Sequence, residues 1–546
     1  MRHPLYTKIA GKRNLEYMKR VSCIILLLLY CIGLSAQQNI KQDDPRVWTP
    51  DNGNGTFTNP LMWGDWPDPD IIRVDDEFYF ISTSMHYVPG CPIAKSKDLV
   101  NWTMAGYAIQ RYEEDPRYDM KGGTLYLNGS WAATIRYHNG LFYVGFCTPY
   151  GLGIPKGHFS MCTAKDVKGP WTRTILPEYL YDPGLLFDDD GKVYVVHGQS
   201  TLYVTELNAD ALSVKGPNVK IIENTHQEGS HFYKINGKYY ILGAAGGTQG
   251  RQVCLRSNNI YGPYESKVII NDDSSYPGNG LHQGGMVQLK NGDWWSIIMQ
   301  DRGPIGRVPH LEPVTWVDEW PMPGKDGKGV VTCQKPDVES IYPVATPATS
   351  DEFDATELGL QWQWNHNPDP EKWSLVDRPG YLRLKAGKAD DLMNARNTLT
   401  QRVQGPMSEG VVEMDVRGLK NGNVAGFGVF QSPYAYVAVK QEGRARQIVM
   451  VNNNKVIATI EKGFKSNKIW FKTTCSHIGF KAFFSYSTDG KHFNTIGNEL
   501  QMDLGLDWTA NRFALFNYTT KDFGIDGYAD FNWFHFSTDY KGPNPG

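Results

Sequence analysis

The sequence predicts an all-β protein in which a five-bladed β-propeller precedes a two-sheet β-sandwich. Aromatic residues make up 13% of the 546 residues, and aromatic side chains are enriched in strands. The chain also has 56 glycines and 32 prolines, which provide many turns, and it has no long helix-forming run. A hydrophobic content of 41% excludes a disordered chain.

Residues 1–36 are predicted to be a signal peptide, with an N-terminal extension before Met18. The basic residues Lys19 and Arg20 precede an apolar run over residues 21–33, and small residues follow at the expected cleavage site. The run is too short to cross a bilayer core of ~30 Å, and the alternative is a short anchor. We therefore expect an exported protein, periplasmic or alternatively secreted, with no membrane partner once the signal is removed.

The charge and the cysteines restrict the class of partner. The whole chain carries −3 and residues 1–36 carry +5, so the mature chain carries −8. Mild acidity without a basic run argues against nucleic acid and is compatible with a neutral ligand such as a sugar. The cysteines form no Cys-x-x-Cys pair and no Cys/His ligand spacing, so we do not expect a zinc site. We expect mostly buried thiols with at most one disulfide. The six cysteines after residue 36 are Cys91, Cys147, Cys162, Cys254, Cys333 and Cys475.

A turn followed by a paired aromatic or apolar–aromatic step recurs five times in residues 50–340. An Asn-Gly or Asp-Gly turn between alternating strands predicts a β-hairpin. Five units of about 50 residues fit a five-bladed propeller, and the alternative is an array of β-sandwiches. The second residues of the five pairs are Tyr79, Tyr143, Tyr194, Tyr240 and Trp295.

One polar or aromatic position recurs 11–13 residues before each of these aromatics. It is occupied by Asp68, Trp131, Asp182, Glu228 and His282. The first strand of every blade lines the central channel, so these side chains should form a ring at one of its mouths. Three carboxylates there could do acid/base chemistry, because neighbouring charges and burial separate their pKa values. A single Asp-Pro is more often a turn residue, and the histidine could equally be a core residue, a water or cation ligand, or a substrate contact.

These motifs resemble glycoside hydrolase family 43 over residues 59–323. The resemblance implies inverting hydrolysis of terminal pentoses, with Asp68 as general base, Glu228 as general acid, and Asp182 as the residue that orients the acid and tunes its pKa. An inverting enzyme needs two carboxyl groups about 6.5–9.5 Å apart, a gap that a propeller mouth provides. No cofactor is required, although some relatives hold a structural calcium near the position of His282. The segments that carry the resemblance are residues 59–60, 66–74, 96–102, 181–192 and 228–234.

Further residues are expected to bind the sugar. The aromatic candidates are Trp63, Trp66, Tyr87 and Trp131, each of which could instead serve in blade packing. Arg307 matches a family arginine that contacts substrate, and its alternative role is a rim salt bridge. His282 completes the set.

A second β-rich region is expected over residues 350–540, after a linker at residues 343–347. Short alternating strands and an Asp489-Gly490 hairpin predict a two-sheet sandwich. The region resembles the lectin-like (concanavalin-like) sandwich of two-domain xylosidases and arabinofuranosidases, which packs on the propeller and favours exo attack. A detached carbohydrate-binding module is the alternative, and the short linker favours packing.

The sequence gives one indication of the preferred sugar. Met85-His86 departs from the pattern of xylosidase relatives and looks more like that of arabinofuranosidase relatives. We therefore expect an α-L-arabinofuranosidase that acts on hemicellulose-derived oligosaccharides. The alternatives are a β-D-xylosidase, a bifunctional enzyme, and a non-catalytic sugar-binding propeller.

Overall fold

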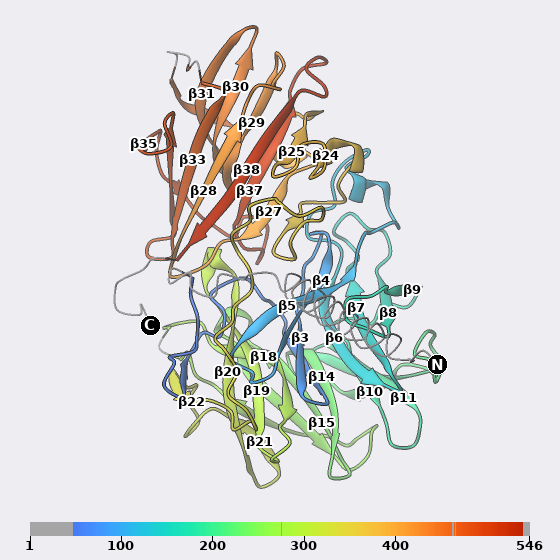
Figure 1. Cartoon of the computed structure of the whole chain (residues 1–546). Coiled ribbons are helices and arrows are strands. Elements are labelled where there is room, and N and C mark those ends of the chain that lie inside the picture. Colours follow the sequence, from blue (N-terminus) through green and yellow to red (C-terminus); the bar gives the residue numbers. More distant parts are fainter. Residues whose placement is uncertain (1–46, 275, 461–463, 465, 539–546) are drawn as a thin grey trace, which may run out of the picture. The chain divides into compact units, whose positions relative to one another are not determined.

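The computed structural model describes residues 47–274, 276–460, 464 and 466–538, and in these residues the protein is almost entirely β (Figure 1). The predicted signal peptide lies outside them. Nowhere in the described part does a helix have the length and apolarity needed to cross a membrane. The helical segments there are five 3₁₀ turns: η1 (Pro116–Asp119), η2 (Gly247–Gln249), η3 (Gly303–Ile305), η4 (Pro370–Lys372) and η5 (Leu392–Asn394).

Five four-stranded antiparallel sheets follow one another along the first part of the chain, and each is a meander of consecutive strands. The blades are β2 (Asp70–Val74), β3 (Glu77–Ile81), β4 (Gly90–Ser96) and β5 (Trp102–Ile109); β6 (Trp131–His138), β7 (Leu141–Thr148), β8 (His158–Ala164) and β9 (Thr172–Leu176); β10 (Gly184–Phe187), β11 (Val193–Gln199), β12 (Thr201–Leu207) and β13 (Val219–Ile222); β14 (Gln227–Ile235), β15 (Lys238–Ala245), β16 (Arg251–Ser257) and β17 (Glu265–Ile270); and β18 (Leu281–Gln288), β19 (Trp294–Asp301), β20 (Arg307–Val317) and β21 (Trp320–Pro323).

The first strands of the blades form a closed ring. Strands β2, β6, β10, β14 and β18 contact one another in this order, and β18 contacts β2 again. The N–H of Gly285 donates to the Pro69 carbonyl across this closure (3.1 Å). Outside the blades, β1 (Thr56–Thr58) pairs with β22 (Thr332–Gln334), which joins the two ends of the propeller chain. The predicted five-bladed propeller is therefore confirmed.

The predicted hairpin turns connect the first and second strands of the blades. Asn139-Gly140 and Asn236-Gly237 have positive φ at both positions, the backbone of a tight hairpin turn. The aromatic residue that follows each turn sits in the second strand and packs into the blade cores. All five of these aromatics are buried: Tyr79, Tyr143, Tyr194, Tyr240 and Trp295.

A buried carboxylate ties the first strands together at the axis. Asp70 is fully buried and accepts from Thr134 Oγ1 (2.9 Å), Arg136 Nη1 (2.7 Å) and His231 Nδ1 (3.1 Å). Burial alone would raise the pKa of Asp70, but Arg136 and His231 hold it below its ordinary value. Asp70 therefore links three blades and serves the fold, although it lies only two residues from Asp68.

The second region is a sandwich of two eight-stranded sheets. One sheet contains β23 (Gln363–Trp364), β26 (Gly387–Lys388), β27 (Leu399–Arg402), β29 (Asn423–Phe430), β30 (Ala435–Glu442), β31 (Ala445–Asn452), β32 (Lys455–Ile460) and β37 (Arg512–Thr519). The other contains β24 (Trp373–Ser374), β25 (Leu382–Lys385), β28 (Met407–Asp415), β33 (Lys468–Ser476), β34 (Lys481–Ser487), β35 (Asn494–Thr495), β36 (Leu500–Gln501) and β38 (Tyr528–Ser537).

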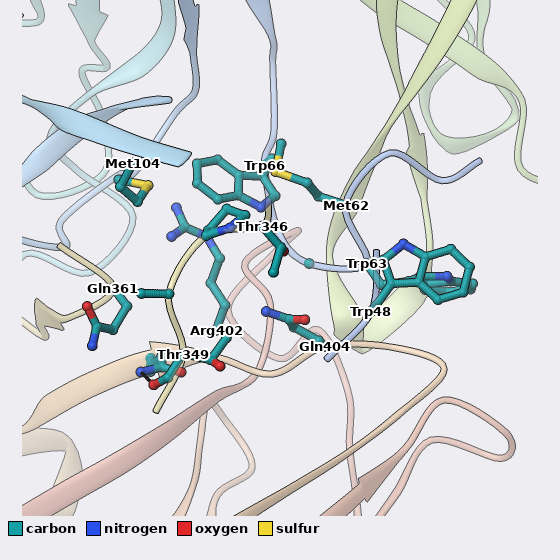
Figure 2. A pocket seen from close by; sticks show the side chains of 14 residues that line it. Trp48, Met62, Trp63, Trp66, Met104, Thr346, Thr349, Gln361, Arg402 and Gln404 are labelled. Atoms are coloured by element: carbon teal, nitrogen blue, oxygen red, sulfur yellow. Dashed lines mark hydrogen bonds between the residues drawn. The ribbon is translucent and has the colours of Figure 1, made fainter. Parts of the chain in front are cut away.

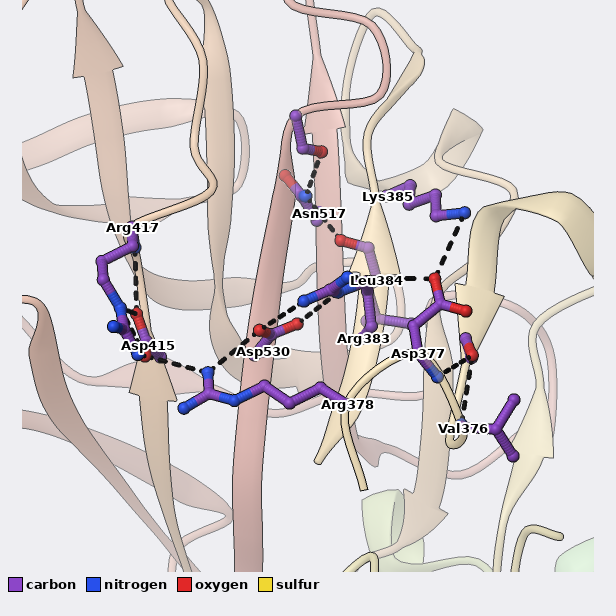
Figure 3. A network of polar contacts seen from close by, with 12 residues as sticks. Val376, Asp377, Arg378, Arg383, Leu384, Lys385, Asp415, Arg417, Asn517 and Asp530 are labelled. Carbon is purple, nitrogen blue, oxygen red and sulfur yellow. Dashed lines mark hydrogen bonds and ion pairs between the residues drawn. The ribbon is translucent and has the colours of Figure 1, made fainter. Parts of the chain in front are cut away.

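An arginine–aspartate network joins three strands of the second sheet (Figure 3). Arg378 Nη1 lies 2.9 Å from Asp415 Oδ2 and 3.0 Å from Asp530 Oδ2. Arg383 makes two further bonds to Asp530 (2.8 and 2.9 Å). Because both carboxylates are buried and paired, this network belongs to the scaffold of the sandwich.

The sandwich packs directly on the propeller. Val88 and Trp364 exchange two backbone hydrogen bonds (3.0 and 2.6 Å), and Arg402 Nε donates to the Asp65 carbonyl (2.6 Å). Tyr107 Oη donates to the carbonyl of Leu360 (2.6 Å). The linker therefore leads into a docked region, as its short length predicts.

Candidate active site

Each blade carries one residue with left-handed backbone at the entrance of its first strand. It lies four positions before the residue that pairs with the blade aromatic. Asp68 and Asp182 occupy this position themselves, whereas Trp131, Glu228 and His282 lie one residue before it. The five left-handed residues are Asp68 (φ 54°), Ala132 (44°), Asp182 (48°), Gly229 (67°) and Gln283 (46°).

Strand bulges account for this offset. The register shifts between Trp131 and Thr134 in β6, between Glu228 and His231 in β14, and after His282 in β18. A bulge inserts an extra residue and re-aims the side chains beside it. The predicted positions therefore lie at one end of the propeller, but in two classes. This offset, together with a first hairpin that is one residue longer in the third and fifth blades, explains why their sequence spacing varies from 11 to 13.

Asp68 is buried, and both of its carboxylate oxygens are held. Thr83 Oγ1 donates to Oδ2 (2.6 Å) and Arg307 Nη1 donates to Oδ1 (2.9 Å). Each carboxylate oxygen has a second lone pair, so both partners orient the group and leave acceptor capacity for a water molecule. Thr83 was not predicted from the sequence, because a threonine after a strand carries no distinctive signal.

Asp182 and Glu228 form a second acidic group. The N–H of Gly229 donates to Asp182 Oδ2 (3.0 Å), so the residue after Glu228 contacts Asp182 directly. Burial, then the nearby charges of Glu228 and Asp68, raise the pKa of Asp182 well above its ordinary value. The three predicted carboxylates are thus brought together, and they repel one another.

Glu228 is partly buried and faces two donors on the neighbouring blade. Tyr181 Oη donates to Glu228 Oε2 (3.1 Å), and Gln199 Nε2 donates to the same oxygen (2.6 Å). The charge of Asp182, burial and the charge of Glu228 raise the pKa of Tyr181 far above its ordinary value, so Tyr181 stays a donor. Tyr181 could have been predicted as a site residue because it directly precedes Asp182, whereas no feature of the sequence points to Gln199.

A chain of charged groups connects His282 to Asp68. His282 Nε2 lies 3.4 Å from Asp301 Oδ2, and Arg307 Nε donates to Asp301 Oδ1 (3.2 Å). Arg307 also contacts Asp68, so the two aspartates flank one guanidinium. Burial opposes its charge, but the carboxylates of Asp301 and Asp68 raise the pKa of Arg307. Arg307 therefore lies beside Asp68, and its contact with substrate stays a prediction. His282 is connected to Arg307 only through Asp301.

His282 lies between a backbone carbonyl and a buried carboxylate, and the structural calcium expected near it stays a prediction. Its Nδ1 lies 2.9 Å from the carbonyl of Gly280, and its Nε2 faces Asp301, so both ring nitrogens have protein partners. Calcium takes six to eight oxygen ligands. In the described residues no group of three or more His, Cys, Asp or Glu side chains could hold a metal ion.

Two of the predicted sugar-binding aromatics lie in the contact between propeller and sandwich. Trp63 is 1% exposed and packs edge-on against Trp48 and His477 (ring centroids 6.1 and 5.3 Å). The guanidinium of Arg402 stacks on Trp66 at 4.0 Å. Both line a cavity of about 30 Å³ that also contacts Gln404 of the sandwich. Figure 2 shows these side chains around the cavity. The structure therefore accounts for both tryptophans by packing.

Trp131 lies among residues of the site. Its ring meets Trp508, which comes from the sandwich, at 5.4 Å and 70°. The guanidinium of Arg307 lies over the Trp508 ring, 4.0 Å from its centre. Trp508 thus brings the sandwich into contact with Arg307, the arginine that binds the carboxylate of Asp68. No repeat or motif marked it in the sequence.

Tyr87 and His86 both face the sandwich. Tyr87 is buried beneath the guanidinium of Arg512, 4.2 Å from the ring centre. His86 is fully buried, with Nε2 3.1 Å from Asn365 Oδ1, and Leu127 N–H donates to its Nδ1 (3.3 Å). The Met85-His86 pair therefore contacts the sandwich, and the sugar preference inferred from it stays a prediction.

The six cysteines are all free in the structure, and five are buried. Burial raises the pKa of the Cys91 thiol to about 12, so it is unreactive. These thiols act as small packing groups, as predicted, and Cys147 lies beside the site, where its Sγ donates to the carbonyl of Trp131 (3.8 Å).

Comparison with known proteins agrees with this architecture. The profile of Glycosyl hydrolases family 43 matches residues 57–321, and that of the Beta xylosidase C-terminal Concanavalin A-like domain matches residues 350–537. The sandwich therefore is of the concanavalin type expected from the sequence.

Individual relatives cover most of the chain. A β-xylosidase of Formosa agariphila is 32% identical over 90% of this chain and 92% of its own length. A non-reducing end α-L-arabinofuranosidase of Bacteroides ovatus is 36% identical over 67% of this chain and 70% of its own. A solved family 43 enzyme, engineered to display both endo-xylanase and exo-arabinofuranosidase activity, is 30% identical with a TM-score of 0.82 over 88% of this chain and 99% of that chain. The protein is a glycosidase that belongs to glycoside hydrolase family 43.

Proposed function

We propose that this glycosidase is an exo-acting, inverting enzyme that removes a terminal non-reducing β-D-xylose from hemicellulose-derived oligosaccharides. The observation that carries the proposal is the meeting of Asp68, Asp182 and Glu228 at the entrance of the propeller's first strands, with Asp68 and Glu228 held by separate partners. Two carboxyl groups with separate partners and a third that perturbs them suit a division into base and acid.

The proposed reaction moves two protons. Asp68 takes a proton from a water molecule, whose oxygen attacks the anomeric carbon. Glu228 donates a proton to the leaving oxygen as the glycosidic bond breaks, and the configuration inverts. Thr83 and Arg307 orient the base. Burial and the charges of Glu228 and Asp68 raise the pKa of Asp182, and its carboxyl group lies beside the proposed acid.

The choice of xylose over arabinose rests on the relatives. The β-xylosidase matches nearly the whole chain, sandwich included, whereas the arabinofuranosidase matches two thirds of it. The sequence argument for arabinose rested on Met85-His86, which is buried at the sandwich contact. α-L-Arabinofuranosidase activity is the second candidate, since that relative is 36% identical over two thirds of the chain. We further propose export to the periplasm and catalysis without a cofactor.

Two substrates separate the roles of the carboxylates. Glu228→Gln should lower kcat on xylobiose by about 10³-fold but barely affect dinitrophenyl xyloside, whose leaving group needs no proton. Asp68→Asn should lower both by a similar factor. Glu265→Gln, on an exposed residue of the same blade as Glu228, should match wild type.

The arabinofuranoside of the same leaving group is measured in parallel. Faster turnover of the arabinofuranoside by wild type would move the assignment to the second candidate and keep the mechanism. Wild-type protein without turnover of either sugar would overturn the proposal, and so would a Glu228→Gln variant with undiminished xylobiose hydrolysis.

A further inference from the structure

Three tyrosines form a row that leads from the candidate general acid to the surface. Tyr181 Oη donates to Glu228 Oε2 at 3.1 Å. The rings of Tyr181 and Tyr179 lie 6.0 Å apart, and those of Tyr179 and Tyr150 lie 5.3 Å apart. Tyr150, at the outer end, is 62% exposed. Exposed aromatic side chains next to a catalytic pocket are a common means of holding a ligand.

The row lies at the same end of the propeller as the carboxylates. Tyr150 follows the end of β7, and Tyr179 and Tyr181 precede the start of β10, where Asp182 also lies. In the proposed function Glu228 gives its proton to the leaving oxygen. A surface that starts at Glu228 and leads outward therefore lies beside the leaving group.

The loop that carries Tyr150 is held in place. Asn128 Nδ2 donates to the carbonyl of Leu152, and Arg117 Nη2 donates to the carbonyl of Gly153. Ile154 is buried in the core of the first two blades. Because Leu152, Gly153 and Ile154 anchor the loop just after Tyr150, this side chain is exposed without being loose, and binding a ligand would need little ordering.

The same loop also fixes the middle ring. A Cβ at Gly157 would lie 2.6 Å from Tyr179 Cδ2, so the glycine allows the loop backbone to rest directly against that ring. Tyr179 is half-buried as a result, and Tyr150 offers the larger free face. The inner rings, Tyr181 and Tyr179, are therefore packed and half-buried, whereas the outer ring of Tyr150 is exposed.

We propose that Tyr150, supported by Tyr179 and Tyr181, forms an extended subsite for the leaving-group side of the substrate, which binds a xylose residue beyond the cleaved bond. The rings of Tyr150 and Tyr179 meet edge to face (87°) and those of Tyr179 and Tyr181 are tilted by 46°, so Tyr150 is the ring that is free to pack against the apolar face of a sugar. The assignment to the leaving-group side rests on the proposed function. It predicts an enzyme that favours oligosaccharides longer than a disaccharide.

Binding measured by titration calorimetry tests the subsite without turnover. In the Glu228→Gln background, xylotetraose should bind more tightly than xylobiose. Adding Tyr150→Ala should reduce that advantage about fivefold, whereas Tyr150→Phe should keep it, because the ring face remains. Tyr261→Ala is the matched control: Tyr261 is 40% exposed but lies in the turn between β16 and β17, at the other end of the propeller.

Equal affinity for the two ligands would overturn the subsite, and so would an advantage of xylotetraose that survives Tyr150→Ala. Either result can coexist with normal hydrolysis of aryl xylosides, which would leave the proposed function standing. Length-dependent binding in a wild-type protein that hydrolyses no glycoside would reject the proposed function and keep the subsite.

Discussion

Asp182 is the residue at which stability and activity oppose each other most directly. Burial and the charges of Glu228 and Asp68 raise its pKa in the folded protein. As pH rises above the ordinary value, the unfolded chain releases this proton while the folded protein keeps it, so folding loses stability. Asp182→Asn should therefore raise Tm over wild type, more at about pH 7.5 than at about pH 4, and lower kcat about 10²-fold.

Asp188, in the same blade, should change stability with pH in the opposite direction. Burial would raise its pKa, but Lys234 (2.5 Å) and Tyr239 (2.7 Å) hold the pKa below its ordinary value. Its stabilising effect is present at neutral pH and fades as pH falls through the lowered pKa. Asp188→Asn should therefore lower Tm at about pH 7.5. Thermal melts of both variants across pH decide the matter, and a lower neutral-pH Tm for Asp182→Asn would refute the account.

Single residues could be predicted where they recur or adjoin a motif. Asp68, Asp182 and Glu228 were recognisable because each precedes a blade aromatic by a similar distance. Trp508 could not be found in this way, because it reaches Trp131 only through the docking of a distant region. Trp63 and Trp66 fit a sugar platform by composition, but which side of a tryptophan another domain covers is a tertiary property.

At the scale of elements, β14 depends on Gly229. The residue has a φ of 67°, and a Cβ there would collide with the side chain of Gln283 on the next blade. Its N–H also donates to Asp182. Gly229→Ala should therefore displace the carboxylates and lower kcat on xylobiose about 10²-fold, measured at full saturation.

The hairpin at the far end of the same strand supplies the control. Gly237 has a φ of 78°, but nothing lies within 4 Å of a Cβ placed there. Gly237→Ala should lose about 1 kcal/mol of stability from its left-handed backbone and keep its activity. If both variants lost activity alike, backbone strain rather than the collision with Gln283 would be responsible.

The hairpins were predictable and the bulges were not. An Asn-Gly turn between aromatic strands has a local physical cause, the positive φ that such turns need. A bulge after Glu228 or His282 changes the count by one residue and leaves the alternation of buried and exposed positions looking regular. The sequence therefore indicates the correct strands but assigns one common position where the structure has two.

The whole molecule places a sandwich residue in the candidate site. Trp508 contacts both Trp131 and Arg307, and Arg307 holds Asp68. Trp508→Ala should therefore lower kcat/KM for xylobiose about tenfold through the loss of this packing. Phe523→Ala, at a residue of the same sandwich that is 51% exposed, should have no effect.

A wild-type kcat/KM in Trp508→Ala would show that the sandwich serves stability alone. Its docking surface could not be read from the sequence: Tyr87 and His86 were interpreted as markers of the sugar site, and Trp364 looks like an ordinary strand residue. The two-domain order was predictable from the linker and the family resemblance. Which side chains meet across the contact depends on the folded surfaces of both regions.

The central claim, that Asp68 and Glu228 act from opposite sides of the glycosidic bond, is tested most directly by the configuration of the first product. Proton NMR during hydrolysis of a β-xyloside by the wild-type enzyme resolves the two anomers before mutarotation mixes them. The account predicts that α-xylose appears first, because water directed by Asp68 attacks the face opposite the bond that Glu228 protonates. Initial release of β-xylose would contradict it, since retention requires a covalent intermediate on one of these carboxylates.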